Sequence, residues 1–100
     1  MSIKIIYATI EHLEAIVEIW GANRQTLGLM PRDAFVDSIK KKWILLCCIG
    51  KDIVGYLQFR HTMKTQTLSI VHLCIEKSHR GKGYPELLLN RLVHCCPIKI

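Results

Sequence analysis

The sequence of 100 residues lacks a hydrophobic run long enough to cross a membrane. Its longest unbroken apolar segment extends from Trp43 to Ile49, whereas a membrane-spanning helix needs about 20 apolar residues. The N-terminal segment also lacks the apolar core and small-residue cleavage site of a secretory signal peptide. We therefore expect a cytoplasmic protein with no membrane partner.

The sequence also lacks the cysteine spacing of a metal site or a disulfide scaffold. No C-x-x-C pair occurs among the five cysteines, and two adjacent pairs, Cys47–Cys48 and Cys95–Cys96, stand in its place. Neighbouring side chains on a strand point to opposite faces, so Cys47 and Cys48 are not expected to reach one metal ion. The cysteines are predicted to be buried thiols in a reducing compartment, and no metal site is expected.

Acidic residues are scarce in the second part of the chain. Residues 40–100 contain eleven Lys and Arg against three Asp and Glu, so the net charge of +6 is concentrated there. Such a region attracts an anion, which could be a phosphate, a phosphorylated cofactor or a nucleic acid. The competing interpretation is a basic surface that only keeps the protein in solution. A nucleic acid is disfavoured, because no aromatic residues interleave with the basic ones and no recognition helix is apparent.

The composition is that of a globular chain, with half of the residues hydrophobic and 22% charged. No repeat, linker or low-complexity segment divides it, so residues 1–100 are predicted to form a single domain. Apolar residues at helical spacing and β-rich runs predict the order β-α-α-β-β-β-α-β, a mixed α/β sheet with helices on its faces. The predicted strands are residues 2–9, 43–49, 53–61, 67–75 and 98–100, and the predicted helices are residues 9–21, 31–42 and 86–94.

The basic, glycine-containing segment 76–85 follows a predicted strand and leads into a predicted helix. A helix N-terminus presents unpaired N–H groups and a partial positive charge. Gly81 and Gly83 would let an anion approach these amides, and Arg80 and Lys82 would add positive charge, so a phosphate site is predicted. The dinucleotide-binding and P-loop patterns do not match, because the third glycine and the hydroxyl residue that they need are absent. The alternative is an ordinary helix cap with basic residues in solvent.

Residues 80–85, Arg-Gly-Lys-Gly-Tyr-Pro, resemble the acetyl-CoA loop of the GNAT superfamily of N-acetyltransferases, whose signature is Gln/Arg-x-x-Gly-x-Gly/Ala. The signature is matched at the Arg and at the first required glycine, whereas Pro85 stands where the family has Gly or Ala. The order of elements over residues 3–94 is similar to the family's, as are IVGYL at 53–57 and HLCI at 72–75. The resemblance implies a mainly antiparallel sheet with helices on both faces. It also implies direct acetyl transfer from acetyl-CoA to an amine.

The resemblance further implies roles for individual residues. Backbone groups of residues 73–75 would pair with the pantetheine arm as an added strand would. Amides of residues 81–84 would hold the pyrophosphate with help from Arg80 and Lys82, and an N–H near Cys74 would stabilise the oxyanion. The implied cofactor-binding residues are therefore Leu73, Cys74, Ile75, Arg80, Gly81, Lys82, Gly83 and Tyr84.

A general base must take a proton from the attacking amine. His72 is the ionisable candidate on the strand where the family often places this base. Family bases more often occupy the positions of Ser69 and Val71, which the two-residue period of a strand puts on the face opposite His72. A histidine buried beneath a helix is the competing interpretation of His72.

Family members continue beyond Ile100 with the rest of the fifth strand, a further helix and further strands. These parts usually supply a tyrosine that protonates the leaving thiolate, and part of the acceptor pocket. By this resemblance we expect a shortened N-acetyltransferase domain that holds acetyl-CoA and is weakly active or inactive, with an unidentified amine as acceptor. The alternative is a non-catalytic CoA-binding module, or one that forms a homodimer through the exposed edge of the fifth strand.

Overall fold

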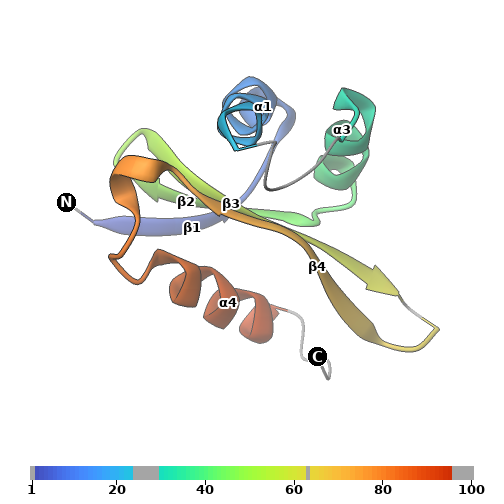
Figure 1. The fold of residues 1–100 in the computed structure, drawn as a ribbon. Coiled ribbons are helices and arrows are strands. Elements are labelled where there is room, and N and C mark those ends of the chain that lie inside the picture. Colours follow the sequence, from blue (N-terminus) through green and yellow to red (C-terminus); the bar gives the residue numbers. More distant parts are fainter. Residues whose placement is uncertain (1, 24–29, 63, 96–100) are drawn as a thin grey trace.

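The computed structural model describes residues 2–23, 30–62 and 64–95 and is drawn in Figure 1. Its elements follow the predicted order from the first strand to the last described helix, while the expected strand at residues 98–100 lies outside the described residues. The elements are β1 (Ile3–Tyr7), η1 (Ile10–His12), α1 (Leu13–Ala22), α3 (Arg32–Lys40), β2 (Ile44–Ile49), β3 (Asp52–Thr62), β4 (Thr67–Ile75), η2 (Lys77–His79) and α4 (Tyr84–Cys95).

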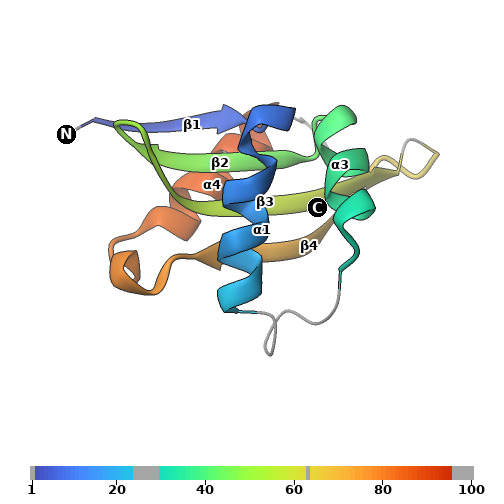
Figure 2. The same cartoon turned by 90° about the horizontal axis from the view of Figure 1, so that it is seen from above.

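The strands form one sheet in the order β1-β2-β3-β4, in which every neighbouring pair is antiparallel. Helices α1 and α3 lie on one face of the sheet and α4 lies on the other, as Figures 1 and 2 show. The predicted fold class, an antiparallel α+β sheet with helices on both faces, is therefore confirmed. The sheet ends at β1 and β4 within the described part of the chain, since the fifth strand predicted as a dimer edge lies outside it.

Strand β2 is buried on both faces, which explains its continuous apolar sequence. Its side chains alternate between two cores. Ile44, Leu46 and Cys48 pack beneath α1 and α3, whereas Leu45 and Cys47 pack against α4. The prediction that Cys47 and Cys48 are buried on opposite faces is confirmed.

The helices differ from the predictions at their ends. The first begins with the turn η1, capped by Thr9, and continues into α1. Helix α3 ends at Lys40 rather than at the predicted Lys42, whose φ of +60° is left-handed and incompatible with a continuing helix. Helix α4 begins at Tyr84, two residues before the predicted start. Pro85 is tolerated in its first turn, because the N–H that proline lacks has no partner there in any helix.

Helix α4 buries only part of the apolar sequence that it carries. Leu88 and Leu92 are fully buried and Leu89 is half-buried, whereas Val93 is 46% exposed. Each residue on a helix is rotated by about 100° from the one before it. A single helix against one sheet face thus buries fewer positions than the apolar sequence offers.

An extra residue in β4 changes which side chains share a face. Gln58 of β3 pairs with His72, but the next residue, Phe59, pairs with Ile70, so Val71 forms a bulge. Beyond the bulge Ser69 pairs with Arg60, which lies on the same face of β3 as Gln58. Ser69 therefore lies on the same face as His72. The prediction of opposite faces is wrong, because a bulge interrupts the two-residue period.

The described helices include none that is both long enough and apolar enough to span a membrane.

Gly55 marks a close approach between β3 and β4. A Cβ atom there would lie 2.4 Å from Ile75 Cδ1 and 2.8 Å from the Cys74 carbonyl oxygen. We expect Gly55→Ala to lower the free energy of unfolding by about 1–3 kcal/mol, because the backbone of β4 would have to move. Urea unfolding followed by circular dichroism measures this change.

Gly21 provides the matched control for this variant. It lies in α1, and a Cβ atom there would meet nothing within 4 Å. Gly21→Ala should raise the free energy of unfolding by about 0.5–1 kcal/mol through helix propensity. Equal stability of Gly55→Ala and the wild type would contradict the close approach of the two strands.

Candidate functional site

Strand β4 ends the described sheet, so one of its edges does not face β3. The Glu76 N–H donates to the Val54 carbonyl of β3 over 2.7 Å. Peptide groups of successive strand residues point to alternate sides. The backbone groups of Leu73 and Ile75 therefore point away from β3, and those of Cys74 point toward it. Of the three residues predicted to meet the pantetheine arm, Leu73 and Ile75 present their N–H and C=O groups on this side, which we call the outer edge of β4.

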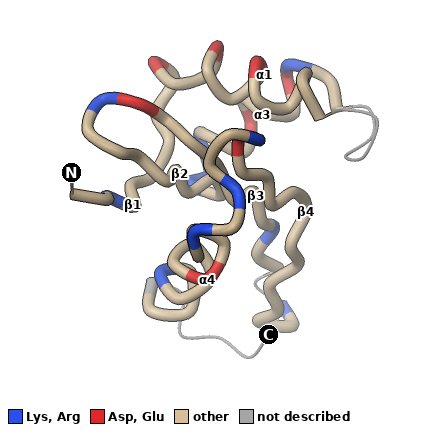
Figure 3. The backbone as a smooth tube through the Cα atoms, turned by 60° about the vertical axis from the view of Figure 1, so that its left-hand side comes forward, with Lys and Arg blue, Asp and Glu red and all other residues tan. Residues whose placement is uncertain are grey.

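A glycine turn, residues 80–84, connects η2 to α4. Gly81 and Gly83 have φ values of +79° and +80°, a region that residues with a Cβ atom adopt only under strain. Lys82 between them is exposed. Figure 3 shows basic positions along the segment that leads into α4. The turn thus brings backbone amides, a lysine and the N-terminus of α4 together beyond the end of β4.

Tyr84 directs its side chain into the core beneath the sheet. It is 7% exposed and belongs to the cluster that includes Leu88 and Leu92. Its ring centroid lies 6.5 Å from that of His79. Tyr84 therefore anchors the glycine turn to the core through its ring.

The Arg80 side chain lies along the outer edge of β4. Its Nε donates to the Ile75 carbonyl over 3.0 Å, and its Nη2 donates to Asn23 Oδ1 over 2.6 Å. Asn23 follows the last residue of α1 and was not among the predicted site residues. An asparagine at a helix C-terminus is a recognisable cap in sequence. Its contact with Arg80 could not be predicted in the same way, because the two residues are 57 positions apart in the sequence.

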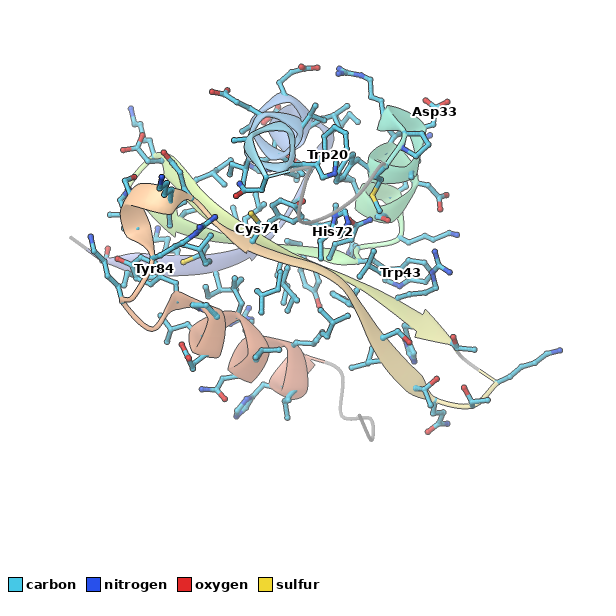
Figure 4. All side chains as sticks on the ribbon, in the orientation of Figure 1. Trp20, Asp33, Trp43, His72, Cys74 and Tyr84 are labelled. Carbon is cyan, nitrogen blue, oxygen red and sulfur yellow. The ribbon has the colours of Figure 1, made fainter. Side chains whose placement is uncertain are left out.

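His72 is buried at 6% exposure on the face covered by α1 and α3. Figure 4 shows the His72 side chain on the side of β4 that faces these helices. Its Nδ1 lies 3.3 Å from Tyr56 Oη, and its ring centroid lies 6.4 Å from that of Phe35. Burial, with Cys74 nearby, raises the pKa of Tyr56, so its hydroxyl keeps its proton. These surroundings are those of a histidine packed beneath a helix. The catalytic role of His72 stays a prediction.

The Cys74 thiol lies inside the core, although its strand provides the outer edge. It is 5% exposed and packs in the cluster beneath α1 and α3. Burial raises the pKa of the thiol, and the charge and hydrogen bond of Arg80 oppose that rise. Arg80 therefore approaches Cys74, Ile75 and Asn23, which makes it the group that connects α1 to the end of β4.

Metal ligands do not gather in the described ranges, where no group of three or more His, Cys, Asp or Glu side chains could hold an ion.

A family model described as "Acetyltransferase (GNAT) family" matches residues 9–97 of the chain. The match extends from η1 through the bulged strand and the glycine turn to the end of α4. The chain belongs to the GNAT family of acetyltransferases. No curated protein sequence matches it.

Solved structures share the fold of this GNAT chain at low sequence identity. PaiA N-acetyltransferase from Thermoplasma acidophilum, solved with coenzyme A, has a TM-score of 0.80 and 15% identity over 97% of this chain and 73% of its own. Diaminobutyrate acetyltransferase EctA from Paenibacillus lautus, solved with its substrate and coenzyme A, has a TM-score of 0.80 and 16% identity over 92% and 57%. N-acetylglutamate synthase from Neisseria gonorrhoeae has a TM-score of 0.77 and 16% identity over 97% and 23%. The GNAT chain thus spans less than two thirds of the latter two.

The buried thiols make the stability of the protein depend on pH. Burial raises the pKa values of Cys47, Cys48 and Cys74 above the usual 9.0. Above about pH 9 the unfolded chain releases these protons while the folded chain retains them, so the free energy of unfolding should fall as the pH rises. Below that pH the thiols should contribute no slope.

Urea unfolding under reducing conditions, compared between about pH 7 and about pH 10, measures this dependence. Cys47→Ala, Cys48→Ala and Cys74→Ala should each make the decline less steep. An equally steep decline in all three variants would assign the effect to other groups.

Proposed function

We propose that the protein binds acetyl-CoA along the outer edge of β4 and transfers the acetyl group to an amine. The observation that carries this proposal is that two features suited to the two parts of coenzyme A follow one another along the chain. The outward backbone groups of Leu73 and Ile75 suit the amide-containing pantetheine arm, and the glycine turn that follows η2 suits the pyrophosphate. Coenzyme A is also present in the solved structures of PaiA and EctA, which have the same fold.

The pantetheine arm would bind as an added strand. Its amide groups would exchange hydrogen bonds with the outward N–H and C=O groups of Leu73 and Ile75. The Cys74 peptide, which points toward β3, is already engaged in the sheet. The proposed contribution of Cys74 is therefore packing behind the arm.

The pyrophosphate would bind at the glycine turn. The proposed donors are the amides of residues 81–84, which lead into the N-terminus of α4, where the helix dipole favours negative charge. Lys82 is exposed and can pair directly with a phosphate. Pro85 contributes no donor, and the carboxylate of Glu86, in the first turn of α4, lies close to the glycine turn, with Oε2 3.8 Å from the position of a Gly83 Cβ. Affinity would then depend on the balance between Lys82 and Glu86.

The proposed reaction is a direct acyl transfer. The amine nitrogen attacks the thioester carbonyl carbon, the C–S bond breaks, and coenzyme A leaves as the thiol after it takes up a proton. The outward N–H groups on either side of Cys74 are the proposed donors to the oxyanion. His72 is the proposed base. Because its ring is buried, the amine proton would reach it through a water molecule.

Substitutions of the charged residues at the glycine turn and at the start of α4 test the proposed cofactor site. Lys82→Gln should weaken acetyl-CoA binding by about three- to tenfold and Glu86→Gln should strengthen it, because the ligand is an anion. Isothermal titration calorimetry measures both changes. Lys51→Gln, an exposed lysine in the β2–β3 turn, is the matched control and should bind like the wild type. The absence of saturable binding to the wild type at roughly 1 mM ligand would refute the proposed function.

Turnover distinguishes an enzyme from a CoA-binding module. Thiol release from acetyl-CoA, followed across a panel of small amines, peptides and proteins, should depend on the amine. His72→Gln should retain acetyl-CoA affinity and lose at least about tenfold in turnover, since general-base catalysis contributes at least that much. Binding without amine-dependent thiol release would establish the non-catalytic alternative. Full turnover in folded His72→Gln would remove His72 as the base.

A further inference from the structure

A chain of three hydrogen bonds joins the C-terminus of α1 to the outer edge of β4. Asn23 Nδ2 donates to the Ile19 carbonyl over 2.8 Å, which fixes the orientation of the Asn23 amide. Asn23 Oδ1 then accepts from Arg80 Nη2, and Arg80 Nε donates to the Ile75 carbonyl. We call the contact between the two side chains the Asn23–Arg80 bridge.

The bridge pairs a cationic donor with a neutral acceptor. An arginine guanidinium has donors but no acceptor, and the side-chain oxygen of asparagine only accepts. The planar guanidinium also presents its Nε and Nη2 donors in a rigid arrangement, so holding Nη2 at Asn23 helps to keep Nε on Ile75.

The Ile75 carbonyl is one of the groups that the proposed cofactor arm would use. It points away from β3, and in the structure it accepts a hydrogen bond from Arg80. The pantetheine arm and the Arg80 guanidinium would therefore compete for the same oxygen. This step rests on the proposed function, in which the arm pairs with the outer edge of β4.

We propose that Asn23 is a positioning residue that holds Arg80 on the Ile75 carbonyl until the cofactor arm displaces it. The bridge then acts as an intramolecular competitor of coenzyme A. Only molecules in which the bridge is open can bind the cofactor arm. The apparent affinity is therefore lower when a larger fraction of the molecules has the bridge closed. Once released, the Arg80 guanidinium stands next to Gly81 in the chain, where it can pair with the pyrophosphate.

Variants at Asn23 should move affinity in opposite directions. Asn23→Ala removes the acceptor of Arg80 and should bind coenzyme A about three- to tenfold more tightly than the wild type. Asn23→Asp replaces the amide by a carboxylate, strengthens the bridge and should bind more weakly. Both variants lose the Nδ2 donor to Ile19, so any difference between them does not arise from the helix cap. Calorimetric titration with coenzyme A measures each affinity.

Asn90→Ala, at the other asparagine of the sequence, is the matched control and should leave the affinity unchanged. Unchanged or weaker binding of coenzyme A by folded Asn23→Ala would overturn the proposal, because Ile75 would then accept both donors or the bridge would assist binding. If the wild type does not bind coenzyme A at all, the proposed function fails instead.

The bridge can also be observed in the wild type without any variant. The Arg80 Nε–H should give an NMR signal protected from solvent exchange in the cofactor-free protein. Saturating coenzyme A should shift this signal and increase its exchange rate. An unprotected signal in the free protein, or a signal that stays the same when coenzyme A is bound, would overturn the proposal.

Discussion

The pairing of β3 with β4 determines where every part of the candidate site lies. Gly55 faces Ile75 with no space for another carbon atom, and the Glu76 N–H continues the pairing to Val54. This contact fixes which peptide groups of β4 point outward and where the strand ends. The glycine turn begins a few residues later, so its distance from the outer edge of β4 follows from the same contact. A shift in this pairing would separate the two surfaces that one elongated ligand would have to meet.

Much of the scaffold could be predicted from sequence because the evidence for it is local. The apolar run of β2 corresponds to a strand buried on both faces, and the positive φ angles of Gly81 and Gly83 explain why glycine stands there. The bulge at Val71 could not be predicted, since Val71 is an ordinary strand residue and its unpaired position depends on the register with β3. The face of Ser69 was predicted wrongly for that reason. The contact of Arg80 with Asn23 was missed because it joins residues that are 57 positions apart in the sequence.

The basic residues of the chain make several different kinds of contact. Lys41 pairs with Asp37 over 3.0 Å, and its Nζ lies 4.8 Å from the Trp43 ring centroid. It therefore stabilises the connection between α3 and β2. Arg80 serves the junction between α1 and β4. Lys82 is exposed on a turn whose backbone is arranged around a helix N-terminus. The basic residues in the second part of the chain are thus divided between contacts within the fold and the exposed Lys82 at the proposed phosphate site.

An edge strand that must bind a ligand faces two opposing requirements. Its outward peptide groups have to be available to the ligand, yet unpaired groups on a sheet edge also invite pairing with other chains. In this protein the Arg80 guanidinium covers part of that edge by donating to Ile75, and Asn23 holds it there. A side chain can leave the edge by rotating about its own bonds, whereas a paired strand would have to separate along its length. Covering the edge with an arginine therefore protects it, and the proposed ligand, which brings its own negative charge, could displace the arginine without separating two strands.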